Sequence, residues 1–160
     1  MSLESVRAFF AQHAPDIAIL EIDGSSATVT LAAEAFGVEP ARIAKTLSFR
    51  LGDRVVLLVT RGDARLDNKK TKAAFGAKPR MLDLDEVVAI TGHPVGGVCP
   101  FGLPTPLPVY CDVSLKAFDE VVPAAGSTQT AVRISPERMA ALTGAQWVDV
   151  CQEPAAQAAQ

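Results

Sequence analysis

Glycine and proline crowd the segment 93–108, HPVGGVCPFGLPTPLP, so densely that neither a helix nor a long strand is expected there. Gly96 and Gly97 allow close approach to the backbone, while Pro100 and Pro104 limit the freedom of the loop. A stiff loop of this kind can hold bare N–H groups toward a carbonyl oxygen that gains charge during acyl transfer. The segment therefore predicts a site for acyl-transfer chemistry, although a stiff connection between a helix and an edge strand would have the same composition.

A thiol and an imidazole lie in the same segment, at Cys99 and His93. They could act as a nucleophile and its base, but a small thiol packed beside Pro100 is the commoner fate of such a cysteine. With Cys111 they could also be zinc ligands, yet five and eleven residues separate them and no fourth ligand is nearby. We therefore expect no metal and no organic cofactor.

Charge is distributed unevenly along the chain. The net charge of −3 alone argues against a nucleic-acid partner. Residues 61–80, however, contain seven Lys/Arg and two Asp/Glu, a net charge of +5 in an otherwise acidic chain. A phosphate-facing strip and a merely solvated basic helix explain this segment equally well. The candidate phosphate contacts are Arg61, Arg65, Lys69, Lys70 and Lys72.

Size and composition indicate one compact domain. The chain has 160 residues, of which 49% are hydrophobic and 21% charged. No apolar run reaches the roughly 18 residues of a membrane span, and the first residues lack the features of a secretory signal. Three cysteines without a CxxC pair argue against a disulfide framework. We expect a cytoplasmic protein with one domain over residues 1–152 and a disordered tail over 153–160.

The first half of the chain has local signals for three helices and a hairpin. Ser2 can cap a first helix that stops at Pro15, and a strand is expected over 17–22. A second helix should end at Gly37, and Pro40 suits the start of a short third one. Two β-rich runs then flank the turn Leu51-Gly52-Asp53, which predicts a hairpin. Lys45 is expected where the short helix meets this hairpin.

The second half alternates helices and strands irregularly. Helices are expected from Asp67 or Asn68 to Gly76, from a capping box at Asp83 and Glu86 to Gly92, and over SPERMAALTG. Strands are expected over 78–82, 109–113, 130–134 and 145–150. Together the elements predict an α+β (mixed α/β) fold, with a twisted mixed, largely antiparallel sheet surrounded by helices.

Several sequence blocks, taken in order, point to one family. They are AAEAFGV followed by IAKTL, then RGDARLDNKKTKAAFG, TGHPVGGVCPFGL, and AAGS followed by VRISPERMAALTGA and a final VDV. From about Leu20 to Val150 the chain resembles the YbaK and prolyl-tRNA-synthetase-associated aminoacyl-tRNA deacylases. The spacing Gly96-x-x-x-Pro100 looks like the family's GxxxP loop, and Lys45 in AKTL matches its characteristic lysine.

The resemblance implies an enzyme that hydrolyses the ester between a wrong amino acid and its tRNA, with water assisted by the terminal ribose hydroxyl. Gly96, Gly97 and Pro100 would hold the aminoacyl end, and Lys45 would contact a phosphate or the substrate carbonyl. Polar candidates for the pocket lining are Thr28, Thr46, Ser48, His93, Cys99 and Ser127, although caps or turns would also explain most of them. The alanine-editing branch typically reads AKNLFL, whereas this chain reads AKTLSF, which weakens an alanine-specific assignment.

Three hypotheses follow from the sequence. The first is a freestanding editing enzyme that removes a small amino acid such as Cys, Ser, Thr or Ala from tRNA, with tRNA-Pro a candidate. Its partners would be the acceptor end of aminoacyl-tRNA and an aminoacyl-tRNA synthetase, without a membrane, and the protein would be a monomer or weak dimer. The second is a non-catalytic module of the same fold that docks on tRNA or a synthetase. The third is a thiol hydrolase acting through Cys99.

Overall fold

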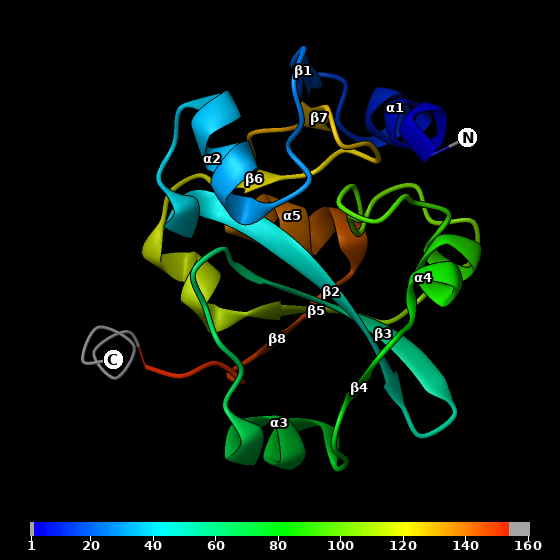
Figure 1. The fold of residues 1–160 in the computed structure, drawn as a ribbon, viewed down its shortest axis with the longest axis vertical. Helices are drawn as coiled ribbons and strands as arrows, with labels where there is room; N and C mark the ends of the chain where they lie inside the picture. Colours follow the sequence, from blue (N-terminus) through cyan, green and yellow to red (C-terminus); the bar gives the residue numbers. More distant parts are fainter. Residues whose placement is uncertain (1, 154–160) are drawn as a thin grey trace.

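A long hairpin forms the centre of the protein, whose structure is a computed structural model that describes residues 2–153 (Figure 1). Strands β2 (Ile43–Leu51) and β3 (Arg54–Arg61) pair antiparallel along their whole length. Gly52, with a φ of 63°, takes the left-handed conformation that the two-residue turn requires. β3 is buried on both faces between Val56 and Val59, which suits its unbroken run of apolar residues. The predicted hairpin is confirmed.

The rest of the main sheet adds strands on both sides of this hairpin. β3 pairs parallel with β5 (Val109–Asp112), which pairs parallel with β8 (Gln146–Val148). On the other side, β2 pairs antiparallel with β4 (Arg80–Met81) near the turn and parallel with β6 (Val122–Pro123) at its start. The predicted mixed sheet is confirmed: the longest ladder is antiparallel and the short ladders β2–β6, β3–β5 and β5–β8 are parallel.

β2 is therefore flanked at both ends of its outer edge but not in the middle. β6 contacts Ile43 and Ala44, whereas β4 contacts Phe49 and Arg50. Among the described residues, no strand pairs with the outer edge of β2 between these two contacts, over residues 45–48. A second sheet of two strands, β1 (Leu20–Glu21) and β7 (Thr130–Ala131), lies beside this part of the molecule (Figure 1).

Four of the five α-helices in residues 2–153 begin and end where local signals in the sequence place them. The main ones are α1 (Ser2–His13), α2 (Val29–Phe36), α3 (Asn68–Phe75), α4 (Leu84–Thr91) and α5 (Pro136–Thr143). Side chains of Thr28, Asp67, Asp83 and Ser135 cap the first turns of α2 to α5, and a left-handed glycine ends each of those four helices. Two 3-10 helices, η1 (Pro40–Arg42) and η2 (Val113–Ala117), complete the set.

Some sequence-based expectations are wrong in detail. Ser2 lies inside α1, and its hydroxyl contacts His93 and Gly126 instead of capping the helix. The strand expected over 17–22 has only two residues, as does the strand expected over 130–134. Lys45 is the third residue of β2 and not a boundary residue. Neither η2 nor β6 was expected, because both depend on tertiary contacts more than on local sequence.

Apolar clusters cover both faces of the sheet. One face packs against α1, α5 and the 93–108 loop, through residues such as Phe10, Met139 and Phe101. The opposite face packs against α3 and the segment after β8, including Val150 and Cys151. Figure 1 accordingly shows α1 and α3 at opposite ends of the molecule. No helix within residues 2–153 is long and apolar enough to cross a membrane. Of the expected tail, only Glu153 lies within the described residues.

Candidate active site

A cavity of about 310 Å³ opens at the middle of the outer edge of β2, where the strand has no neighbour. Residues 45–48 of β2 line one side, and the N-terminal end of α2 with Ser26 and Ala27 lines another. The remaining walls come from the start of α4, the loop around Gly96 and the strands β6 and β7. The break in the sheet therefore creates the cavity.

The open edge of β2 presents main-chain polar groups to this cavity. Ser48 O accepts a hydrogen bond from Leu82 N at 3.3 Å, so the main chain of Ser48 faces outward, away from β3. Alternate residues of an antiparallel strand direct their N–H and C=O groups the same way. Thr46, two residues earlier, therefore directs its N–H and C=O toward the cavity, where they can bind a ligand's polar atoms.

Hydroxyl groups are the main polar side-chain atoms of an otherwise apolar lining. Thr46 Oγ1 is buried and has no hydrogen-bond partner within residues 2–153. Ser48, 4% exposed, lies on the same wall, while Ala32, Phe36 and Ile43 contribute apolar surface. An unsatisfied buried hydroxyl costs about 1–3 kcal/mol. A ligand with one polar atom on a small side chain would satisfy it.

Lys45 supplies the positive charge of the site. Its Nζ donates a hydrogen bond to Ala64 O at 2.7 Å, which fixes the half-buried side chain and leaves two N–H donors for other partners. Burial is the main cause that lowers the pKa of Lys45 from its usual value, and the carboxylate of Asp63 partly offsets it. A fixed ammonium at the cavity can bind a phosphate or a carbonyl oxygen that gains charge.

Both glycines of the loop pack closely against other parts of the chain, and one of them also lines the cavity. Gly96 lines the cavity with a φ of 86°, and a Cβ placed on it would lie 2.8 Å from Ala27 Cβ. A Cβ on Gly97 would lie 2.7 Å from the main-chain carbon of Ser127, and Gly97 is not among the lining residues. Gly97 thus leaves room for another part of the chain, and its predicted contact with the substrate stays a prediction. Pro100 is also buried away from the cavity.

His93 and Cys99 lie in the core, which corrects their assignment to the substrate-binding site. Both are completely buried, and neither lines the cavity. His93 Nε2 lies 2.8 Å from Phe101 O and 3.6 Å from Cys99 Sγ, and burial lowers the pKa of His93. Burial raises the pKa of Cys99 to about 12, so the thiolate required of a nucleophile is not formed near neutral pH.

The other predicted hydroxyl residues divide into two groups. Thr28 caps α2 by accepting a hydrogen bond from Leu31 N at 3.2 Å, yet it also lines the cavity together with Thr46 and Ser48. Ser127 does not line the cavity; its Oγ lies 2.7 Å from Thr130 Oγ1 and accepts from Gln129 N. The structure thus brings together three of the predicted lining residues and places the other three elsewhere.

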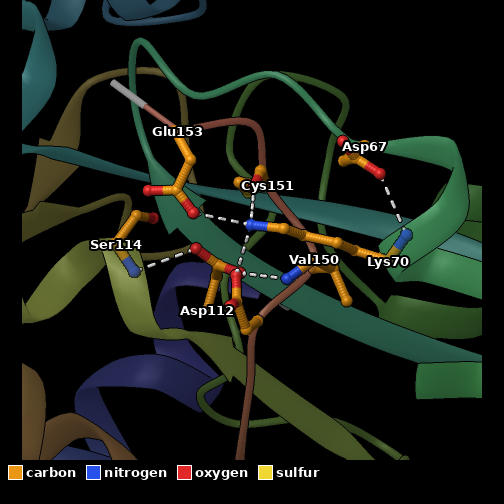
Figure 2. A network of polar contacts seen from close by, with 8 residues as sticks. Asp67, Lys70, Asp112, Ser114, Val150, Cys151 and Glu153 are labelled. Atoms are coloured by element: carbon orange, nitrogen blue, oxygen red, sulfur yellow. Dashed lines mark hydrogen bonds and ion pairs between the residues drawn. The ribbon is translucent and has the colours of Figure 1, made fainter. Parts of the chain in front are cut away.

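The basic segment 61–80 does not form a uniform strip. Lys69, Lys72 and Arg65 are exposed. Arg61 pairs with Asp63 at 2.6 Å and lies over the Phe118 ring. The ammonium of Lys70 donates hydrogen bonds to Asp149, Glu153 and Cys151 O (Figure 2). These contacts do not support its assignment as a phosphate contact.

An apolar rim at the cavity was missed in the sequence. Met81 and Leu84 are 63% and 67% exposed, Val95 is 48% exposed, and all three line the cavity. The signal was present in α4, where LDEVVAIT places apolar residues on more than one side of a short helix. Exposed apolar side chains around a cavity are typical of a surface that contacts a ligand or partner.

Comparison with known proteins supports the resemblance found in the sequence. The family described as the aminoacyl-tRNA editing domain matches residues 23–142. "Uncharacterized protein YwhH" of Bacillus subtilis is 50% identical over 155 residues, covering 96% of this chain and 99% of its own length. The "Putative Cys-tRNA(Pro)/Cys-tRNA(Cys) deacylase EbsC" of Enterococcus faecalis is 32% identical over 121 residues, covering 74% of this chain and 73% of its own.

A solved structure shares the whole fold. It is described as the "Crystal structure of a putative trans-editing enzyme for prolyl tRNA synthetase". The two proteins superpose with a TM-score of 0.87 and 33% sequence identity, over 95% of this chain and 98% of the other. The fold class expected from the sequence is thereby confirmed.

Proposed function

The chain belongs to the aminoacyl-tRNA editing domain family, and we propose that it is a freestanding deacylase that hydrolyses the ester of mischarged aminoacyl-tRNA. The observation that carries this proposal is the cavity at the open edge of β2. Both Thr46, whose buried Oγ1 has no partner among residues 2–153, and Lys45, whose side chain points to the other face of β2, line this cavity. Such a site offers binding groups and a positive charge but no strong nucleophile, which suits an ester that is already activated.

The proposed reaction needs no protein nucleophile. Water attacks the ester carbonyl carbon and loses a proton with the help of the terminal ribose hydroxyl of the tRNA. The bond between the carbonyl carbon and the ribose oxygen breaks, and this oxygen takes up a proton and leaves as an alcohol. The carbonyl oxygen gains negative charge in the transition state, and the ammonium of Lys45 or an outward N–H of β2 stabilises it. The carbonyl of Thr46 would accept a hydrogen bond from the substrate's α-ammonium group.

The cavity has room for a small aminoacyl group. A volume of about 310 Å³ must hold the aminoacyl group and part of the terminal ribose. Thr46 and Ser48, which both carry hydroxyls, line the cavity. Cys, Ser, Thr or Ala would fit, and the name of the Enterococcus relative, which refers to Cys-tRNA(Pro), supports Cys on tRNA-Pro as the first to test.

The partners follow from the same proposal. The acceptor end of tRNA would approach the cavity over the apolar rim, with Arg65, Lys69 and Lys72 as phosphate contacts elsewhere on the surface. The solved relative described as acting for prolyl tRNA synthetase supports a synthetase as a second partner. A cytoplasmic location fits both.

The test is deacylation of a panel of aminoacyl-tRNAs by the wild-type protein and by Lys45→Met, which keeps an apolar stem but removes the charge. We expect wild type to release at least one of Cys, Ser, Thr and Ala, to leave correctly charged Pro-tRNA intact, and to lose this activity in Lys45→Met. Binding of the panel without hydrolysis would contradict catalysis and favour a non-catalytic tRNA-binding module. Hydrolysis unaffected by Lys45→Met would contradict the proposed site.

A further inference from the structure

The segment after β8, residues 149–153, pairs with the loop between β3 and α3. Leu66 and Cys151 form an antiparallel bridge. Asp67 N donates to Val150 O at 2.8 Å, and Gln152 N donates to Arg65 O at 2.8 Å. This segment lies beyond residue 142, where the match to the editing-domain family ends.

Lys70 fastens this segment from one side. Its Nζ donates to Asp149 Oδ1 at 3.1 Å, to Cys151 O at 3.0 Å and to Glu153 Oε1 at 2.9 Å (Figure 2). The two carboxylates raise the pKa of Lys70, so it stays charged throughout the physiological range. All three N–H donors of the ammonium are therefore used within the protein.

Asp112, at the end of β5, fastens the segment from the other side. Its carboxylate is 1% exposed and accepts from Val150 N at 2.8 Å and from Ser114 N at 2.9 Å (Figure 2). A buried carboxylate with two main-chain donors is a fixed point of the structure. The segment is thus held between Asp112 in the core and Lys70 at the surface.

The loop that receives this segment also holds Lys45. Ala64 O, in the same loop, accepts the hydrogen bond from Lys45 Nζ at 2.7 Å. Ala64, Val150 and Cys151 belong to one apolar cluster on the α3 face of the sheet. A displacement of the segment would therefore move the carbonyl that orients the ammonium.

We propose that the segment 149–153, fastened by Lys70, positions the ammonium of Lys45 at the cavity through the loop that carries Ala64. Lys70 is then a positioning residue and not a phosphate contact. This inference rests on the proposed function for its catalytic consequence, but the position of Lys45 can also be measured without a substrate.

Because the contacts of Lys70 lie at the surface, the effect of Lys70 on the rate can be distinguished from its effect on thermal stability. The side chains of Asp149 and Glu153 are 59% and 72% exposed, and exposed ion pairs contribute little to folding. A small misplacement of a catalytic group, in contrast, can reduce a rate by up to about 100-fold. Loss of Lys70 should therefore reduce the rate of the chemical step more than it reduces thermal stability.

The kinetic experiment compares Lys70→Met with Lys78→Met, which alters an exposed lysine shortly after α3 that has no hydrogen bond or ion pair to residues 149–153. We expect Lys70→Met to lower kcat by about fivefold to tenfold, with KM within about twofold of wild type and an unchanged dependence of tRNA binding on salt. Lys78→Met should match wild type, and Lys70→Arg should retain most of the activity because it keeps the charge. An unchanged kcat in Lys70→Met would overturn the proposal, as would a raised KM with a weaker salt dependence.

A second measurement needs no activity. The rate at which an amine-reactive ester labels Lys45 is followed against pH by peptide mass spectrometry, in wild type and in Lys70→Met. Burial lowers the pKa of Lys45, so looser packing should raise that pKa toward its ordinary value in the variant and leave it unchanged in Lys78→Met. Identical labelling curves would overturn the positioning role. A wild type that hydrolyses nothing in the panel would instead contradict the proposed function, while the labelling result would still stand.

Discussion

The middle of β2 and the loop 93–101 both carry polar groups beside the same part of the sheet, but they use them differently. In the loop, the imidazole of His93 contacts Phe101 O and Ser2, and Gly97 N donates to Pro94 O. On β2, Thr46 Oγ1 has no partner among the described residues, and no strand covers the outer edge. The polar groups of the loop thus form hydrogen bonds within the protein, whereas some polar groups of the strand remain available for a ligand.

Amino-acid composition alone therefore does not locate a binding site. Glycine, proline, histidine and cysteine in one loop predicted chemistry there, yet both His93 and Cys99 are buried in the core. What a binding site needs is polar groups that the fold leaves without partners, and only tertiary structure shows which these are. The following experiments test whether the two regions differ in this way.

The largest effect is expected at the β2 edge, for Lys45→Met. Loss of a fixed charge that stabilises a developing oxyanion should reduce kcat/KM for deacylation by about 100-fold. Because burial lowers the pKa of Lys45, its charge is lost at a lower pH than that of an exposed lysine. The wild-type rate, corrected for spontaneous hydrolysis, should therefore fall as pH rises through that lowered pKa, and this alkaline fall should be absent in Lys45→Met.

Lys45→Arg is the control that keeps the positive charge of the side chain but changes its shape. A planar guanidinium cannot reproduce the compact ammonium that donates to Ala64 O, so only part of the activity should return. Full activity of Lys45→Met, or an alkaline fall that persists in it, would assign the charge requirement to another group.

A smaller effect is expected for Thr46→Val, which replaces the unpartnered hydroxyl with a methyl group of similar size. Deacylation of a substrate with a polar side chain should fall by about tenfold in kcat/KM, because its hydrogen bond is lost. Stability should not fall, since the hydroxyl makes no bond within residues 2–153. Thr143→Val is the matched control: its hydroxyl donates to Met139 O, away from the cavity, and its loss should leave the kinetics unchanged. Equal rates for wild type and Thr46→Val would remove this hydroxyl from substrate binding.

In the loop, Gly97→Ala should affect stability and not chemistry. The added Cβ would meet main-chain atoms of Ser127, and such overpacking costs about 2 kcal/mol. For a chain of this size the melting temperature should fall by about 6 °C, while the rate per folded molecule stays within about twofold of wild type. Gly24→Ala, where a Cβ meets nothing within 4 Å, is the control for calorimetry. A large loss of rate with an unchanged melting temperature would instead indicate that Gly97 belongs to the active site.

The smallest effect is expected for Cys99→Ser. The thiol is buried, its pKa is raised to about 12, and a serine hydroxyl could keep the hydrogen bond to Phe101 O. Deacylation should therefore proceed at nearly the wild-type rate. Complete loss of activity, with an acyl adduct on Cys99 detected by mass spectrometry in the unmodified protein, would favour a thiol hydrolase instead.

Local signals made most of the fold predictable. The Asp83–Glu86 capping box, the left-handed glycines and the Gly52 turn depend on neighbours in sequence, and each is found where it was expected. β6, and the choice of which strands pair in parallel, depend on distant partners, and the sequence did not reveal them. Two hydrophobic residues, as in β6, carry too little pattern to identify a strand.

The site was predictable only where its residues adjoin a recognisable motif. Lys45, Thr46 and Ser48 were identified beside AKTL, and all three line the cavity. The gap between β4 and β6 that exposes them depends on strand pairing, which no local pattern encodes. The commitment of Lys70 to residues 149–153 likewise joins segments far apart in the chain.

The most direct test of the β2 edge as the active site is a chemical-shift map with an uncleavable ligand. The ligand is adenosine that carries cysteine at its 3′ carbon through an amide instead of an ester. We expect it to shift the backbone amide signals of Lys45, Thr46 and Leu47 and that of Val98, which all line the cavity, while the amide of the buried Phe101 stays unchanged. Shifts confined to the region of Arg133 and Arg138, on a different surface, would contradict the assignment of this edge as the place where the aminoacyl end binds.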